Sequence, residues 1–173
     1  MEPVLAHVVD RCREAVSGPD PQTRVIEIVR EAMADPAMPA AIAPRSEYET
    51  LEDLALHRSP ELTIFAAAFA PGLGVGPHNH NMWSVVGVCS GQEENRFFER
   101  DGGGLRDVGV ETVEGPGVLS NAADVIHAIR NPLDVPLLAL HVYGGDLFGV
   151  PRSSWDPDTH EEAVFDWSRS VEN

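Results

Sequence analysis

The chain has 173 residues, of which 43% are hydrophobic and 23% charged, and its formal net charge is −16. This length is typical of one domain with its own core, and no apolar run in the sequence approaches the roughly 20 residues needed to span a bilayer. Phosphate binding needs clustered Lys and Arg, and the 12 basic residues are outnumbered by 28 acidic ones. We therefore expect neither a nucleic-acid partner nor a membrane partner.

The N-terminal third of the chain predicts helices. Residues 3–17 carry apolar side chains at helical spacing, and a second helix with its own apolar stripe begins at Asp20 or Pro21. Three prolines between residues 36 and 44 predict a loop, and residues 46–57 predict a short helical piece. We expect these helices to pack against the outside of the remaining domain.

The first 16 residues and the cysteines bear on the cellular compartment. MEPVLAHVVDRCREAV carries charges where a signal peptide needs an apolar core, so we expect no export. Cys12 and Cys89 are too few for a disulfide framework and are interpreted as reduced thiols. Both observations favour a cytoplasmic protein.

From about residue 61 the pattern changes to short apolar runs separated by glycine-rich turns. Many short strands at this spacing favour a sandwich or barrel. The polar tail after Tyr143 predicts one helical turn near residues 160–165. The predicted strands are 62–69, 83–89, 94–100, 105–112, 117–120, 125–130 and 137–143.

The stretch PGLGVGPHNHNMWSVVGVCSG carries the first candidate site. Side chains of a strand alternate between faces, so His78 and His80 point the same way. Two imidazoles on a rigid strand hold one divalent metal with little reorganisation, and His127 or His141 is available as the third ligand. The structural alternatives are solvent-facing or core histidines.

These residues resemble the two sequence signatures of the cupin family. Gly72, His78, His80 and Gly91 stand at the spacings of the first signature, and His127 followed by Asn131 matches the end of the second. The resemblance runs from about Arg58 to Asp158. It implies a mainly β protein with a cupin jelly-roll barrel and a metal site formed by His78, His80 and His127.

The resemblance also implies how the chain is organised. We expect a single cupin domain over residues 1–173, with a helical region at 1–57, the barrel core at 58–152 and a tail at 153–173. Cupins often dimerise, so the resemblance allows a homodimer.

One departure from the first cupin signature narrows the activity. Ser84 stands where the family usually has Glu, which leaves three neutral imidazoles, and LALHVYGGDLF resembles the outer motif of thiol dioxygenases such as the cysteine dioxygenases. Glu93 and Glu94 fall past the turn at Gly91 and are disfavoured as replacement ligands. The resemblance implies a mononuclear Fe(II) enzyme that oxidises a small thiol to its sulfinate with O₂.

The same resemblance assigns roles outside the ligand set. It places His141 outside the metal ligands, hydrogen-bonded to Tyr143, whose hydroxyl donates to bound dioxygen or substrate; a core histidine and a core aromatic are the structural alternatives. Val85 occupies the place of the cysteine that animal enzymes crosslink to this tyrosine, so no crosslink is expected.

The sequence indicates the substrate less directly than it indicates the metal ligands. A thiol carboxylate needs a cation, and Arg58 stands roughly where the family carries its substrate arginine; Arg96, Arg100 and Arg130 are further candidates. The bacterial type of the sequence favours 3-mercaptopropionate before cysteine. The alternative functions are another three-His cupin enzyme, such as a C–C-cleaving dioxygenase, lyase or isomerase, or a small-molecule-binding cupin without activity.

Overall fold

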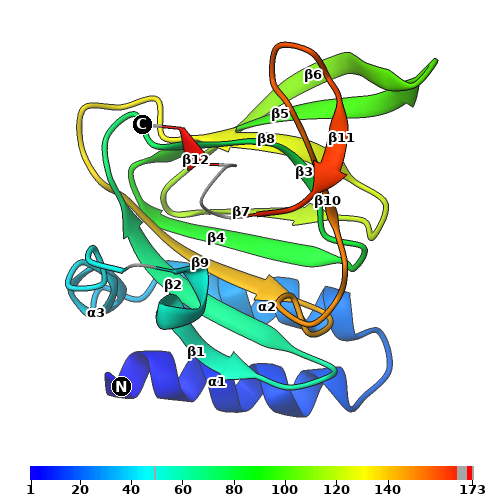
Figure 1. Cartoon of the computed structure of the whole chain (residues 1–173). Helices are drawn as coiled ribbons and strands as arrows, with labels where there is room; N and C mark the ends of the chain where they lie inside the picture. Colours follow the sequence, from blue (N-terminus) through cyan, green and yellow to red (C-terminus); the bar gives the residue numbers. More distant parts are fainter. Residues whose placement is uncertain (49, 167–170, 173) are drawn as a thin grey trace.

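The first 33 residues form the two predicted helices in the computed structural model, which describes residues 1–48, 50–166 and 171–172 (Figure 1). Helices α1 (Pro3–Val16) and α2 (Pro21–Met33) each have proline in the first turn, where its fixed φ suits a helix and its missing N–H loses no bond. No helix among these residues combines the length and apolar character that crossing a bilayer requires.

The segment between α2 and the sheet differs from the prediction in two places. A short helix α3 (Met38–Ile42) forms where a loop was predicted, because Pro39 falls in its first turn and so does not break it. Of the helical piece predicted over 46–57, only residues 51–54 are helical, and residues 55–57 are strand. A 3₁₀ turn η1 (Leu51–Leu54) leads directly into strand β1 (Ala55–Arg58), which pairs with β2.

The strands pair in nested fashion, as in a hairpin that has been rolled up. β2 pairs with β9, β3 with β8, β4 with β7, and β5 with β6, all antiparallel. This gives two sheets, in the orders β1-β2-β9-β4-β7 and β11-β10-β3-β8-β5-β6. It is the connectivity of a double-sheet jelly roll, so the predicted fold class is confirmed. The barrel strands are β2 (Thr63–Phe69), β3 (Gly74–Asn79), β4 (Ser84–Ser90), β5 (Gln92–Asp101), β6 (Gly104–Glu114), β7 (Gly117–Asn121), β8 (Ile126–Arg130) and β9 (Leu137–Tyr143).

The helices cover the outer face of the β2–β9–β4 sheet, as predicted (Figure 1). Leu138, Leu140 and Val142 of β9 join the cluster formed with α1 and α2, while the residues between them point into the barrel. A Cβ at Gly87 of β4 would come within 2.5 Å of Val29 of α2, so glycine allows this close approach. Each fully buried Val or Leu in this layer stabilises the fold by about 1.5–3 kcal/mol.

The chain after β9 returns to the second sheet. β10 (Ser153–Trp155) pairs with β3 and with β11 (Glu162–Val164), and β12 (Val171–Glu172) also pairs with β3. The helical turn predicted near 160–165 is therefore wrong. His160 adopts a left-handed backbone (φ 57°) that directs the chain into the β11 pairing instead.

Candidate metal centre

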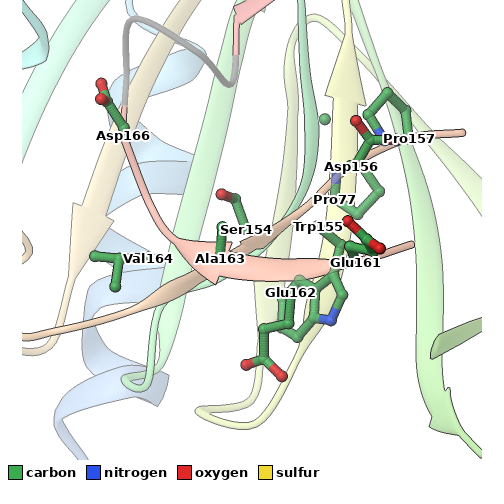
Figure 2. Close-up of a pocket in the computed structure, with 11 residues that line it drawn as sticks. Pro77, Ser154, Trp155, Asp156, Pro157, Glu161, Glu162, Ala163, Val164 and Asp166 are labelled. Atoms are coloured by element: carbon green, nitrogen blue, oxygen red, sulfur yellow. The ribbon is translucent and has the colours of Figure 1, made fainter. Parts of the chain in front are cut away.

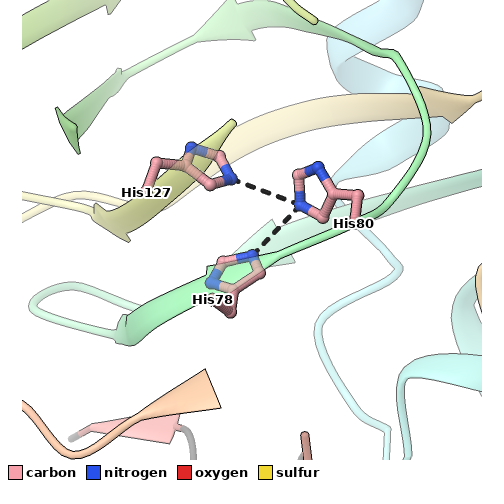
Figure 3. Close-up of side chains that lie close together, drawn as sticks. All are labelled: His78, His80 and His127. Carbon is pink, nitrogen blue, oxygen red and sulfur yellow. Dashed lines mark hydrogen bonds between the residues drawn. The ribbon is translucent and has the colours of Figure 1, made fainter. Parts of the chain in front are cut away.

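Three imidazoles converge inside the barrel, from two paired strands and the turn that follows one of them (Figure 3). His78 in β3 lies directly opposite His127 in β8, and His80 follows the last residue of β3. The Nε2 atom of His80 lies 3.1 Å from Nε2 of His78 and 3.2 Å from Nε2 of His127. All three side chains are buried, so the structure brings together the three ligands that the sequence predicted.

The cluster fits a metal ion in spacing and in proton placement. Two imidazole nitrogens about 2.1 Å from one ion and at right angles to each other lie about 3.0 Å apart. The Nδ1–H of His78 donates to the Gly76 carbonyl and that of His127 to Oδ1 of Asn95, both at 2.9 Å, which leaves their Nε2 lone pairs facing the centre. Nδ1 of His80 is buried without a partner. Two of the three rings are therefore oriented by their surroundings.

The surroundings also keep these rings neutral. Burial lowers the pKa of His127 to about 4. Burial, followed by the neighbouring His127, lowers the pKa of both His78 and His80 well below the ordinary value. Neutral imidazole is the form that coordinates a metal, so the cluster needs no proton release near pH 7.

His141 and Tyr143 lie beside the cluster, on the inward face of β9. The Tyr143 ring packs edge-on against His80, with ring centroids 4.9 Å apart, and His141 stacks on Phe65. The Tyr143 hydroxyl lies 3.5 Å from Nδ1 of His141, at the outer limit of a hydrogen bond. Burial raises the pKa of Tyr143, so its hydroxyl stays protonated and able to donate.

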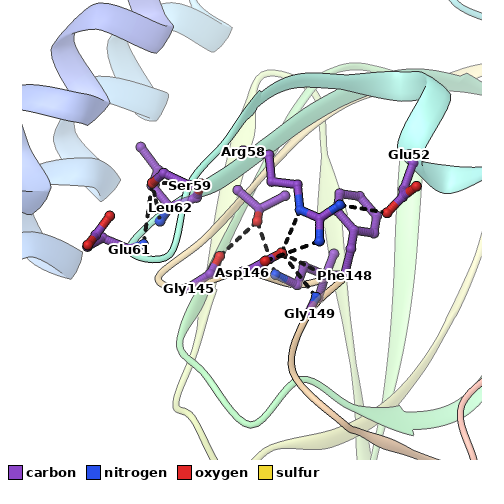
Figure 4. Close-up of polar contacts among 11 residues, drawn as sticks. Glu52, Arg58, Ser59, Glu61, Leu62, Gly145, Asp146, Phe148 and Gly149 are labelled. Atoms are coloured by element: carbon purple, nitrogen blue, oxygen red, sulfur yellow. Dashed lines mark hydrogen bonds and ion pairs between the residues drawn. The ribbon is translucent and has the colours of Figure 1, made fainter.

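Arg58 does not lie among the residues that line this site. Its guanidinium forms a bidentate pair with Asp146, at 2.8 and 3.1 Å, and a further bond of 2.8 Å to Glu52 (Figure 4). It also lies over the ring of Phe148. The assignment of Arg58 as the substrate arginine is therefore corrected: it is an exposed residue that fastens the loop after β9.

Arg152, which the sequence analysis did not single out, lines the same cavity as His78 and His80. Nδ2 of Asn81 donates to the carbonyl of Pro151, and Oδ1 of Asn79 accepts from the backbone N–H of Ser153. The two asparagines next to the ligand histidines thus hold the backbone on both sides of Arg152. Burial lowers the pKa of Arg152 to about 10, so it remains a cation at neutral pH.

Arg152 shares one small, mostly apolar cavity with His78, His80 and His141. Its volume is about 20 Å³, room for about one water molecule. An outer pocket of about 560 Å³ adjoins it and shares four of its lining residues, Leu51, Leu147, Arg152 and Phe165. A ligand that reaches the histidines from this pocket must pass these four. The cavity is lined by Leu51, Phe65, Phe69, Val75, His78, His80, Ile129, His141, Tyr143, Leu147, Arg152 and Phe165.

A separate pocket of about 210 Å³ lies beside β10 and β11 (Figure 2). Its described lining residues include Asp156, Glu161 and Glu162 but none of the three clustered histidines. Its chemistry is that of an acidic surface hollow, and we assign it no part in the metal centre.

Position 84 carries no carboxylate, although the signature that this stretch resembles has glutamate there; the nearest buried carboxylate in the sequence belongs to Glu93. Ser84 accepts a hydrogen bond of 3.2 Å from Asn121 and offers no charge. Glu93 of β5 is fully buried, the one acidic side chain in the described part of the chain for which this holds. It is not one of the three converging ligands.

No protein-family model matches this chain. Solved structures with a similar arrangement include Bacillus subtilis oxalate decarboxylase (18% identity, TM-score 0.44), where 53% of this chain matches 22% of that one. An 11S globulin from Wrightia tinctoria (14% identity, TM-score 0.44) matches with 54% of this chain and 22% of that one. A Streptococcus pyogenes protein of unknown function (16% identity, TM-score 0.43) matches with 58% of this chain and 91% of that one. This chain thus covers under a quarter of the first two proteins.

Proposed function

We propose that this protein is a mononuclear non-heme Fe(II) thiol dioxygenase that converts a small thiol carboxylate to its sulfinate. The observation that carries the proposal is one cavity lined by two of the three converging imidazoles, His78 and His80, together with the half-buried cation Arg152 and the protonated phenol of Tyr143. When bound by His78, His80 and His127, iron supplies the redox chemistry that passes both atoms of O₂ to the thiol sulfur. No external reductant is needed, because the sulfur itself is oxidised.

The remaining cavity residues bind and orient the substrate. A thiol carboxylate that spans the inner cavity and the outer pocket has its sulfur at the histidines and its carboxylate at Arg152, which both spaces share. The guanidinium fork suits a carboxylate. Phe65, Phe69 and Leu147 keep bulk water away from the reacting sulfur.

Charge supports the choice of an anionic substrate. Three imidazoles leave the full dipositive charge of the metal uncompensated by the ligands, and Arg152 adds a further positive charge. The thiolate of such a substrate near the metal site, and its carboxylate at Arg152, would neutralise this excess, since a nearby cation favours the ionised form of a thiol.

Oxygen uptake across a panel of compounds tests the activity. Iron-loaded protein is expected to consume O₂ with 3-mercaptopropionate, more slowly with cysteine, and least with cysteamine, which lacks the carboxylate. Uptake with a non-thiol diketone alone would place the protein among the C–C-cleaving three-His enzymes. A protein that takes up no oxygen with any of them is not a thiol dioxygenase.

Exchanging each arginine for lysine identifies the carboxylate partner. Arg152→Lys keeps the charge but loses the bidentate fork, so we expect KM for 3-mercaptopropionate to rise about tenfold with a smaller change in kcat. Arg58→Lys is the matched control and should leave KM within about twofold, because Arg58 pairs with Asp146 and Glu52 instead. The reverse pattern would return the substrate role to Arg58.

A further inference from the structure

Glu93 is connected by hydrogen bonds to a ligand of the proposed metal centre. The Nδ1–H of His127 donates to Oδ1 of Asn95 at 2.9 Å, and Nδ2 of the same amide donates to Oε1 of Glu93 at 3.0 Å. Asn95 and Glu93 are both fully buried, two residues apart on the inward face of β5. The pairing of β5 with β8 sets this contact, because Asn95 lies opposite Ile129 and two residues before Phe97, which faces His127, so that Asn95 and His127 share one face of the sheet.

The second carboxylate oxygen of Glu93 faces His141, which in turn lies beside Tyr143. Oε2 lies 3.7 Å from Nε2 of His141, and in the described structure both atoms are buried without a hydrogen-bond partner. An orphaned acceptor and an orphaned ring nitrogen at this separation satisfy each other after a shift of well under 1 Å. Ala139, two residues before His141, has no hydroxyl to offer the ring instead.

We propose that Glu93 is a positioning residue that joins His127 to the His141–Tyr143 pair and fixes the proton placement of both imidazoles. The proposal rests on the metal site proposed above and extends it. A carboxylate is an acceptor, so it turns the NH₂ of Asn95 toward itself and the amide oxygen toward His127. His127 then carries its proton on Nδ1 and presents the Nε2 lone pair to the metal.

The same argument applies to the second contact of Glu93, the one with His141. Accepting from Nε2–H of His141 leaves Nδ1 of that ring as the lone pair facing the Tyr143 hydroxyl. Glu93 therefore supplies, from outside the ligand set, the carboxylate that Ser84 does not supply within it. Burial raises the pKa of Glu93 to about 7, and the Asn95 hydrogen bond opposes that rise.

Replacing Glu93 with glutamine tests the proposal without changing side-chain volume. Glu93→Gln offers the Asn95 amide either orientation, so it releases the preference for Nδ1–H on His127. We expect Co(II), titrated against a chelator, to bind about 10- to 100-fold more weakly than to the unaltered protein, the usual cost of losing a partner behind a metal ligand. Glu94→Gln makes the same change at the neighbouring residue, which points to the other face of β5, and should leave Co(II) affinity unchanged.

Imidazole ¹⁵N chemical shifts of the metal-free protein report the tautomer of each histidine ring, so they test the proposal without metal and without activity. His127 and His141 should each show a single tautomer in the unaltered protein and mixed tautomers in Glu93→Gln. Asn95→Ala separates the two contacts, since it should give His127 mixed tautomers and leave the tautomer of His141 unchanged. It also tests the contact with His127 should Glu93→Gln fail to fold. Unchanged tautomers in Glu93→Gln, or Co(II) affinity within twofold, would overturn the proposal. Failure to oxidise thiols, with these shifts as expected, would refute only the proposed activity.

Discussion

His127→Ala is expected to lose most of the bound metal. The substitution removes one of three nitrogens that converge within 4.8 Å of one another, and no other described His, Cys, Asp or Glu belongs to that group. We expect the dissociation constant for Fe(II) or Co(II) to rise by more than about 100-fold, beyond the effect typical of a residue behind a ligand. Metal content after dialysis and competition with a chelator measure it.

The matched control is His141→Ala, which removes another buried histidine from the same barrel. Its Nε2 faces Glu93 and its Nδ1 faces Tyr143, so it has no nitrogen directed at the cluster. It should keep its metal while suffering a comparable loss of buried packing. Equal metal content in the unaltered protein and His127→Ala would refute the ligand assignment.

Tyr143→Phe is expected to lower turnover by about 10- to 1000-fold, the range of about 1.4–4 kcal/mol for one well-placed donor in a buried site. The ring stays in contact with His80, so packing and metal binding should be retained. Only the hydroxyl is lost, and burial keeps that hydroxyl protonated in the unaltered protein. The effect should appear in kcat for 3-mercaptopropionate at saturating concentration.

Tyr48→Phe is the control for removing a phenol hydroxyl, because Tyr48 is not among the residues that line the cavity. It should leave turnover within about twofold. An unchanged kcat in Tyr143→Phe would make Tyr143 a packing residue, and a loss of metal from that variant would show that the hydroxyl supports the cluster instead.

The sequence predicted the local parts of the site because they follow from strand geometry alone. Alternation along residues 137–143 placed Ala139, His141 and Tyr143 on one face, and the structure has all three pointing inward. His78 and His80, two residues apart, were expected to converge, and they do, although His80 lies just after the strand ends. Glycine-rich turns also marked most strand ends, since turn formation likewise depends on only a few neighbouring residues.

Local pattern was insufficient where pairing partners decide the conformation. Residues 55–58 and 162–164 form strands because β2 and β10 lie beside them, which overrides any helical tendency. Arg58 and Asp146 are 88 residues apart, so nothing near Arg58 in sequence indicates that its charge is already paired. The acidic composition made any arginine in a cavity informative, but it did not distinguish Arg152 from the others.

Periodicity and short spacing act within a few residues, so the sequence by itself determined the outer helices, the many short strands of a sandwich or barrel, and the placement of His78 and His80 together. The jelly-roll class and the choice of His127 as the third histidine came from the resemblance of its motifs to a known family. The tertiary structure alone placed Arg152 between two backbone groups that hydrogen-bond to Asn79 and Asn81. It alone placed Glu93 between Asn95, which contacts His127, and His141. These contacts join residues from separate strands. Their partners are fixed only when the two sheets close on each other and exclude water from the polar groups between them.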